Sequence, residues 1–423
     1  MSFPLIRKTL PSGLRLLLLP REEMQSVTVL TLVGVGSRYE SPRQNGLSHF
    51  LEHMFFKGTE NRPTTKEIAE AIDNVGGEFN AFTGEEYTGY YVKVAARHLS
   101  VAADVVSDIL LRPLFPAEEI ERERGVIIEE IRMYTDNPMR HVQHVWMEAL
   151  YGSHPLGRRI DGTEETVSAL KRADFLAYTK KHYHTKNAVV VVAGNFDANK
   201  TTKMLETLFK SLPLGAQAKP KPWTKRTAVH RFKHSYRKTL DQAHIILGVP
   251  GVPRGDEREY AAALLATVLG GGMSSRLFLQ IRERHGLAYM VRTSSDGYLG
   301  TGSFATQAGV RLEKTHDAMR MIQEEYDRIM VEEVPLAELN KAKEIVRGQM
   351  VLQLEETNAL AMFSSEQELL EGKILTPGEI NKKIDAVTPQ EVQALAQQIL
   401  GRKQRAVALL SPHRSTTKFE KLL

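Results

Sequence analysis

The 423-residue chain contains no cysteine. This absence excludes disulfide bonds, thiolate catalysis and cysteine-bound metal ions, and it is typical of proteins from reducing compartments. Any metal site in this protein must therefore be built from histidine, aspartate and glutamate side chains. That restriction narrows the search for chemistry to a small number of clusters.

Long apolar runs are also missing. The leucine run in GLRLLLLP, at residues 13–20, is shorter than the roughly 7–15 apolar residues of a signal-peptide core and predicts a short buried strand instead. No stretch approaches the roughly 18 apolar residues of a transmembrane helix. We therefore expect a soluble, cytoplasmic protein without a membrane partner.

The chain carries little excess charge. Its formal net charge is +5, with 42% hydrophobic and 25% charged residues, which is the composition of an ordinary globular protein. Lysine and arginine do not form a run with interleaved aromatic residues, so we expect no nucleic-acid partner. At roughly 100–200 residues per domain, the length predicts two or three domains.

The predicted secondary structure repeats one order of elements in the two halves of the chain. Each half has a β-branched strand, a helix, a pair of strands, amphipathic helices and a closing buried strand. In the first half the strands lie at residues 26–37, around a turn near Gly84, and at 187–196. In the second half they lie in the segments AHIILGVPG, GLAYMVRTSSDGYLGTGSFATQAGV and QRAVALLSP. The repeat predicts a duplicated α+β unit, each copy a mostly antiparallel sheet packed with helices.

A segment rich in proline, lysine and small residues, at 211–231, separates the two halves and is typical of a linker. We therefore predict a first domain over residues 1–211, a linker over 212–231 and a second domain over 232–423. The tail after Pro412 is expected to be loosely ordered.

The stretch LSHFLEHMFF, at residues 47–56, combines an apolar helix with three titratable side chains. Five of its apolar residues, Leu47, Phe50, Leu51, Met54 and Phe55, are expected in the core. His49 and His53 lie four residues apart and share one helix face, where two neutral imidazoles suit Zn²⁺. Glu52 lies near the same face and is better placed to contact a metal-bound water than the metal. The pattern His-x-x-Glu-His is the inverzincin motif.

The alternative for this helix is a pair of histidines that are simply hydrogen-bonded in the structure. Glu52 and the apolar surroundings favour a metal, because buried ionisable groups need partners. A third ligand must come from elsewhere, and the segment AEEIERERGVIIEEIRMY offers several glutamates. Glu123 and Glu130 share a face, whereas Glu129 points about 100° away. Composition alone does not choose between them, and most of these glutamates are expected to form a solvated acidic face.

The sequence resembles the pitrilysin family of zinc peptidases, which includes insulin-degrading enzyme and the mitochondrial processing peptidases. It is most similar to the half-length bacterial members and to the β subunit of the processing peptidase. The matching stretches follow one another along nearly the whole chain: GLSHFLEHMFFKGTENRP, GGEFNAFTGEEYTGYY, ERERGVIIEEIRMYTDNP, HPLGRRIDGT, VVVVAGNF and LFLQIRERHGLAYMVRTS. The resemblance implies half of a clamshell, because long family members contain four such units around a chamber.

The resemblance also implies the roles of individual residues. In that family 76 residues separate the second histidine from a glutamate ligand, as they separate His53 from Glu130 here. His49, His53 and Glu130 would bind one Zn²⁺ per chain, Glu52 would be the general base, and Glu123 would be an outer carboxylate that orients the site. Asn80, Ala81 and Phe82 would pair with substrate as an edge strand. Arg282 and Tyr289 would hold substrate and stabilise the oxyanion.

The second half lacks the metal motif, since the corresponding helix reads AAALLATV. The resemblance therefore implies a dimer in which Arg282 and Tyr289 of one protomer complete the zinc site of the other. The partner would be a second copy or an inactive homologous chain. We expect a zinc metalloendopeptidase acting on peptides or unfolded segments. The alternative is a non-catalytic subunit like the core proteins of the respiratory bc1 complex, which the intact motif disfavours.

Overall fold

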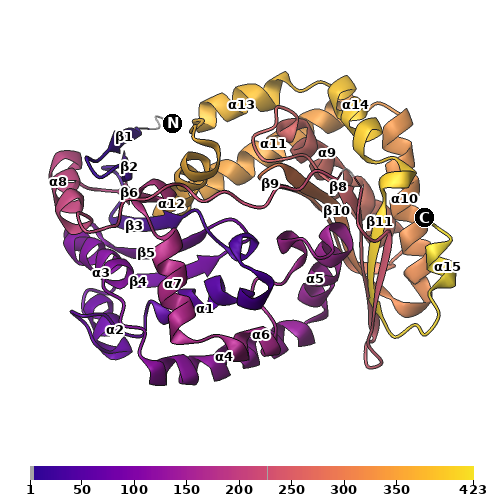
Figure 1. Cartoon of the computed structure of the whole chain (residues 1–423). Helices are drawn as coiled ribbons and strands as arrows, with labels where there is room; N and C mark the ends of the chain where they lie inside the picture. Colours follow the sequence, from indigo (N-terminus) through magenta and orange to yellow (C-terminus); the bar gives the residue numbers. More distant parts are fainter. Residues whose placement is uncertain (1–3, 226) are drawn as a thin grey trace. The chain divides into compact units, whose positions relative to one another are not determined.

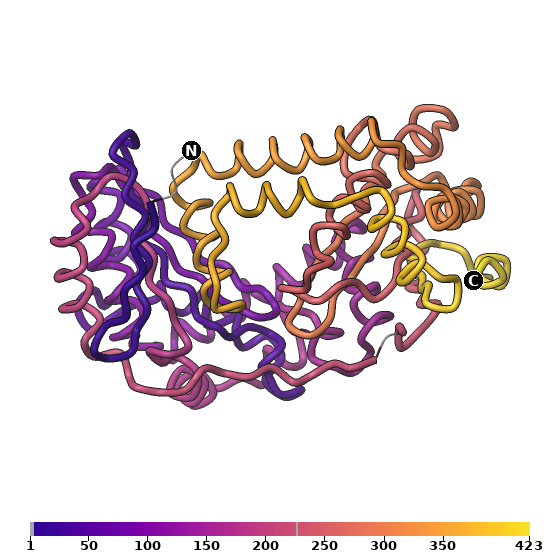
Figure 2. The backbone as a smooth tube through the Cα atoms, turned by 90° about the horizontal axis from the view of Figure 1, so that it is seen from above, coloured from indigo at the N-terminus to yellow at the C-terminus, as the bar shows by residue number. Residues whose placement is uncertain are grey.

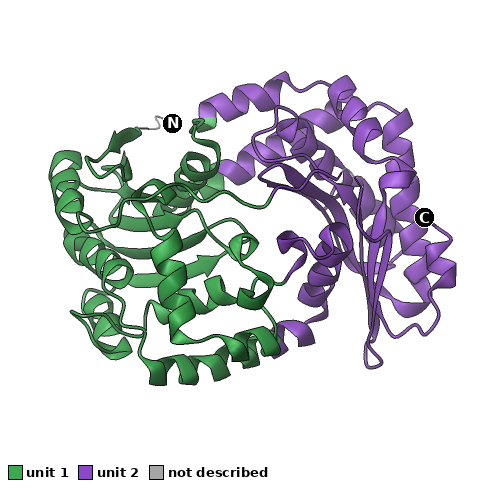
Figure 3. Ribbon diagram, viewed as in Figure 1, with its two compact units in different colours: residues 1–131, 159–221, 351–377 green, residues 132–158, 222–350, 378–423 purple. Residues whose placement is uncertain are grey.

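The computed structural model describes residues 4–225 and 227–423. These residues form two compact units, each built around one β-sheet (Figures 1 and 3). Of the described residues, the first unit comprises 4–131, 159–221 and 351–377, and the second comprises 132–158, 222–225, 227–350 and 378–423. Both sheets pack against helices, which confirms the predicted α+β fold.

The first unit contains a six-stranded sheet in the order β1-β2-β6-β3-β5-β4. Only β2 and β6 pair in parallel; all other neighbours are antiparallel. Leu16–Leu19 in β2 and Val189–Val192 in β6 are fully buried, as expected for central strands covered on both faces. The strands are β1 Ile6–Thr9, β2 Arg15–Pro20, β3 Ser26–Val33, β4 Glu78–Thr83, β5 Thr88–Ala95 and β6 Ala188–Gly194.

The second unit contains a five-stranded sheet in the order β7-β11-β8-β10-β9, with β7 and β11 parallel and the other pairs antiparallel. This is the same series of pairings as β2-β6-β3-β5-β4, so the duplication predicted from the sequence is confirmed. Strand β9 takes the edge position that β4 has in the first unit. The strands are β7 Phe232–Tyr236, β8 Gln242–Pro250, β9 Ala288–Tyr298, β10 Thr301–Arg311 and β11 Ala406–Ser411.

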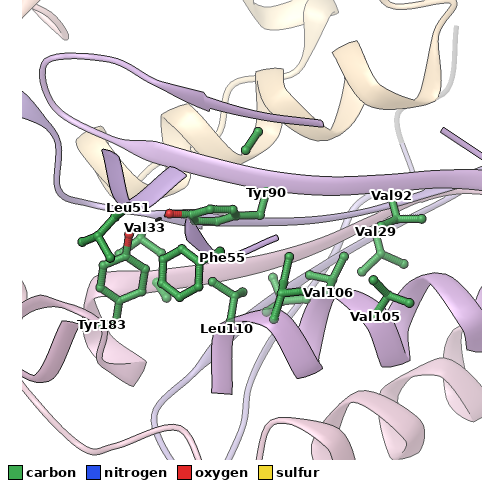
Figure 4. Close-up of a cluster of buried hydrophobic side chains, with 14 of the residues drawn as sticks. Val29, Val33, Leu51, Phe55, Tyr90, Val92, Val105, Val106, Leu110 and Tyr183 are labelled. Carbon is green, nitrogen blue, oxygen red and sulfur yellow. Dashed lines mark hydrogen bonds between the residues drawn. The ribbon is translucent and has the colours of Figure 1, made fainter. Parts of the chain in front are cut away.

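Helices of the first unit enclose its main core. The five apolar residues of the 47–56 stretch that were predicted for the core are fully buried. Figure 4 shows the ring of Phe55 beside Tyr90 and Tyr183, whose hydroxyls are 2.8 Å apart. Helix α8 lies beside the β1–β2 hairpin (Figure 2), where Lys8 donates to Thr202. The helices are α1 Leu47–Met54, α2 Thr65–Asp73, α3 Leu99–Leu111, α4 Ala117–Asp136, α6 Glu164–Ala169, α7 Arg172–His182 and α8 Ala198–Leu208.

Each half of the chain lends one helix to the unit formed mainly by the other half. Helix α12 (Thr357–Glu366) packs Leu360 and Ala361 against β3 and β6 of the first unit. Helix α5 (Pro138–Tyr151) packs on β8 and β11 of the second unit, where Trp146 Nε1 donates to Ser303 Oγ at 2.9 Å. The predicted domain boundaries, with a linker over residues 212–231, stay a prediction. Each compact unit contains segments from both halves of the chain.

The remaining helices belong mainly to the second unit. The prediction of a loosely ordered tail after Pro412 is wrong, because Phe419 is fully buried in this unit's core. No helix among the described residues is long and apolar enough to cross a membrane. These helices are α9 Glu259–Gly270, α10 Thr315–Val331, α11 Leu336–Gln353, α13 Pro377–Ala386, α14 Pro389–Ile399 and α15 Thr417–Glu420.

The buried carboxylate of Asp108, on α3, ties down the loop that follows α1. It accepts hydrogen bonds from Thr59 Oγ1 at 2.6 Å, Asn61 Nδ2 at 2.8 Å, and Arg62 Nη1 and Arg112 Nε at 2.7 Å each. Burial alone raises the pKa of Asp108, but these hydrogen bonds outweigh burial and hold the pKa below its ordinary value.

We expect Asp108→Asn to lower the free energy of unfolding at pH 7 by about 3 kcal/mol, because it leaves two partly buried cations, Arg62 and Arg112, without their partner. The folded-state pKa is depressed, so the ionised carboxylate stabilises the fold above its unfolded pKa of about 3.9. That stabilisation is lost as pH falls through the folded value. Urea unfolding at pH 7 and pH 3 should show a smaller difference between wild type and variant at pH 3. The exposed Asp73→Asn control should change stability by less than about 0.5 kcal/mol.

Candidate metal centre

Helix α1 presents one face to the core and the other to a polar cluster. It begins after Gly46, whose φ of 95° lies in the left-handed region that glycine favours. His49 and His53 lie on the polar face with ring centroids 4.8 Å apart. Glu52 lies between them in sequence and is half-buried. The four-residue spacing therefore brings the imidazoles together as predicted.

Glu130, on α4, meets both imidazoles. Its Oε2 lies 3.6 Å from His49 Nε2 and 3.5 Å from His53 Nε2. Donors bound to zinc at 2.0–2.1 Å in tetrahedral geometry lie about 3.4 Å from one another, so this spacing fits a zinc ion. Within residues 4–225 and 227–423, this is the one group of three or more acidic or histidine side chains with ligand atoms close enough to share a metal.

Glu123 lies two helical turns before Glu130 on α4 and contacts His53 on the side of the ring that faces away from Glu130. Its Oε1 lies 2.8 Å from His53 Nδ1 and its Oε2 lies 2.6 Å from Lys57 Nζ. Both oxygens are therefore engaged, whereas Glu130 remains directed at the two Nε2 atoms. A proton on Nδ1 shared with Glu123 leaves the lone pair of His53 Nε2 facing Glu130, which is the tautomer a metal requires.

The charge balance of the cluster also suits a cation. Burial, followed by the neighbouring His53, lowers the pKa of His49. Burial opposes the charge on His53 too, but the hydrogen bond to Glu123 and the nearby carboxylates outweigh it and raise its pKa. Burial likewise opposes the charge on Glu123, yet its bonds to His53 and Lys57 lower its pKa. Several carboxylates thus favour positive charge at this point.

Glu52 is held by a residue that sequence reasoning missed. Thr83, the last residue of β4, donates from Oγ1 to Glu52 Oε2 at 2.7 Å. Thr83 comes directly after the predicted substrate segment Asn80-Ala81-Phe82, and strand alternation places it on the same face as Ala81. The alternation of side chains along the strand could therefore have indicated that Thr83 faces the site. Lys57 was also missed, although it lies only four residues after His53, just beyond the end of α1.

Strand β4 is the edge of its sheet, as the substrate prediction requires. Among the described strands it pairs only with β5. The N–H of Ala81 donates to the Asn80 Oδ1 atom at 2.9 Å, so the Asn80 side chain satisfies one group of this edge. Phe82 lies on the opposite face from Thr83, with its ring 6.1 Å from that of Tyr87.

Arg282 and Tyr289 belong to the second unit, and the structure brings these two residues together. Arg282 lies in a π-helical turn, Phe278–Arg284, and Tyr289 lies near the start of β9. The guanidinium carbon is 5.1 Å from the Tyr289 ring centroid, a cation–π contact. Tyr289 is 79% exposed, so its hydroxyl is accessible. These residues make no part of the His49–His53–Glu130 group.

Comparison with known proteins shows the family of this chain. Residues 16–164 match the model of insulinase (peptidase family M16), and residues 169–346 match the peptidase M16 inactive domain. An uncharacterized zinc protease of Streptomyces coelicolor is 39% identical over 94% of this chain and 87% of its own length. The uncharacterized zinc protease YmxG of Bacillus subtilis is 37% identical over 96% and 98%. The chain therefore belongs to peptidase family M16 and is of the half-length type.

The fold is also found in solved structures. A protease from Helicobacter pylori aligns with a TM-score of 0.90 at 22% identity, covering 97% of this chain and 100% of that one. At this identity the similarity shows the fold alone. The expected family and its fold class are thus confirmed.

Glu130→Gln tests the ligand set directly. We expect it to weaken Zn²⁺ binding by more than about 100-fold, because loss of a ligand costs more than loss of an outer partner. Glu129→Gln, at the neighbouring exposed position, should change the dissociation constant by less than about threefold. Competition with a coloured chelator measures both. Equal affinities of the two variants would remove Glu130 from the site.

Proposed function

We propose that this chain is a zinc metalloendopeptidase that hydrolyses peptide bonds of peptides or unfolded segments inside a dimeric chamber. One observation carries the proposal: His49, His53 and Glu130 present three donor atoms with the spacing of a zinc ligand set, and Glu52 lies beside them. His49, His53 and Glu130 would hold one Zn²⁺ per chain, and three protein ligands leave a position open for water. The names of the relatives point to the same metal.

The chemistry follows from the residues around that open position. A zinc ion held by His49, His53 and Glu130 would supply Lewis-acid chemistry: it would lower the pKa of water at the site to around 7 and polarise a carbonyl group. Glu52 accepts a proton from the attacking water and delivers it to the leaving amine. The hydrogen bond from Thr83 fixes one oxygen of Glu52, which leaves the other oxygen for the proton. Glu123 keeps the His53 ring in its metal-binding orientation.

Strand β4 supplies the place for an extended substrate. Its outer edge adds a peptide by main-chain hydrogen bonds, with Asn80, Ala81 and Phe82 alongside the scissile region. Because Thr83 joins this strand to Glu52, a peptide paired with β4 runs beside the general base. Unfolded segments meet this requirement, since an edge strand pairs only with extended backbone.

We further propose that the active unit is a dimer. On the second unit, the exposed Tyr289 contacts the partly exposed Arg282. This pair would complete the zinc site of a partner protomer by holding substrate and stabilising the oxyanion. The partner is a second copy or a homologous inactive chain. A second copy is the simpler assembly, because closed twofold symmetry is the commonest form of oligomer.

Glu52→Gln is the sharpest test of catalysis. The amide cannot take the proton, so we expect peptide cleavage to fall by about 10²–10⁴-fold while zinc content stays at one ion per chain. Metal analysis and cleavage of a quenched peptide measure the two properties separately. Exposed Glu60→Gln serves as the matched control with wild-type activity. A zinc-loaded Glu52→Gln protein with normal turnover would exclude Glu52 as the base.

Mixing two inactive variants tests completion in trans. We expect Glu52→Gln and Arg282→Ala proteins to be inactive alone and to recover about a quarter of wild-type activity after subunit exchange. Half of the dimers are then mixed, and each mixed dimer has one intact site. Exchange is followed by a fluorescent label on one variant. Mixed dimers without recovered activity would contradict the assignment of Arg282 to the partner's site.

A further inference from the structure

Glu40 is a buried carboxylate that binds the start of the helix carrying the candidate ligands. It is 3% exposed and lies seven residues before α1. Its carboxylate accepts hydrogen bonds from Gly46 N at 2.9 Å, Ser48 N at 2.6 Å and Asn45 Nδ2 at 3.1 Å. Each oxygen thus engages a backbone N–H at the first turn of α1.

This contact replaces the cap that α1 lacks. The helix has only eight residues, and its N-cap residue, Gly46, has no side chain to accept from the unpaired N–H groups. A carboxylate at this end also complements the positive end of the helix dipole. A Cβ at Gly46 would lie 2.9 Å from the carbonyl oxygen of Asp161, so the backbone is closely fitted on its other side.

The two histidines differ in what holds them. His53 is oriented by Glu123, but His49 Nδ1 is buried and has no hydrogen-bond partner among the residues that the structure describes. No side-chain hydrogen bond therefore fixes the ring of His49. Its position depends on the backbone of α1, and the residue before it, Ser48, is the one whose N–H Glu40 binds most closely.

Glu40 itself stands on a rigid support. It follows a 3₁₀ turn, Ser37–Tyr39, in which Arg38 is 1% exposed and ion-paired with Glu86. Arg38 also donates from Nη2 to the carbonyl of Lys221 at 2.8 Å, and its N–H donates to the carbonyl of Glu85 at 2.9 Å. Because these contacts are buried, the turn cannot move without breaking several of them.

Keeping Glu40 ionised has an energetic cost. Burial raises its pKa to about 7, although the hydrogen bonds from Ser48, Asn45 and Gly46 act in the opposite direction. A serine or aspartate at the N-cap would satisfy the helix without burying a remote charge. A buried carboxylate that is costly to ionise therefore lies at the helix start next to His49, whose ring has no side-chain hydrogen bond to fix it.

We propose that Glu40 is a positioning residue for His49: by anchoring the first turn of α1 it sets the affinity of the metal centre. The proposal rests on the proposed function insofar as that function requires zinc at His49, His53 and Glu130. It assigns Glu40 no contact with metal or substrate.

The test measures zinc affinity separately from folding and from proteolysis. Glu40→Ala removes both acceptors, and Glu40→Gln keeps the shape and one acceptor. Glu67→Ala is the matched control. Glu67 accepts a hydrogen bond from Thr64 N at 2.9 Å and so caps helix α2, which carries none of the candidate zinc ligands. We expect Glu40→Ala to weaken zinc binding about 10–100-fold, as loss of an outer partner does, and Glu40→Gln to weaken it less. Glu67→Ala should lower the thermal midpoint only.

A cobalt-loaded sample adds a spectroscopic readout. The visible absorption of Co²⁺ in Glu40→Gln should differ from wild type, whereas that of Glu67→Ala should match it. Wild-type zinc affinity and an unchanged cobalt spectrum in a folded Glu40→Gln or Glu40→Ala protein would overturn the proposal. If Glu40→Ala does not fold, Glu40→Gln decides. A wild-type protein that fails to bind zinc would instead refute the proposed function.

Discussion

The burial of ionisable side chains on α1 is the constraint on which the site depends. An imidazole or carboxylate inside a protein needs a partner, and His49 and His53 share a helix with four fully buried apolar residues. The structure meets this need by directing Glu130 at both rings and Glu123 at one of them. These contacts leave a cluster with excess negative charge, whose natural complement is a divalent cation. The core packing of α1 and its chemistry are two results of the same helix.

Three contacts from different parts of the first unit fix the position of α1. Glu40 anchors the first turn, Asp108 ties down the loop after the last turn, and Thr83 links the polar face to an edge strand. The second unit repeats the sheet, but its corresponding helix, α9, carries apolar residues at the equivalent face. Duplication therefore supplied the scaffold twice, while the described residues contain one copy of the candidate ligand set.

Much of this could be predicted from the sequence. The buried face of α1, the pair of strands around Gly84 and the repeated sheet follow from local periodicity, and the structure confirms them. The sequence could not predict that α5 packs on the sheet of the second unit and α12 on the sheet of the first. The apolar face of an amphipathic helix shows that it is buried, but not which sheet it covers. Glu130 could be separated from Glu123 only through family resemblance, since helical spacing places both on one face. Glu40 and Lys57 act through tertiary contacts that no short motif contains. The tail is ordered by the buried Phe419 and by Leu422 and Leu423, which pack against the same core.

The central claim is that a single zinc ion, held by this cluster, makes the chain a peptidase. The most direct measurement is cleavage of a quenched, unstructured peptide by metal-free protein during titration with Zn²⁺. The account predicts no cleavage without metal, a rise that ends at one zinc per chain, and no further gain beyond it. Cleavage by the metal-free protein, or none by a dimer carrying one zinc per chain, would contradict the account.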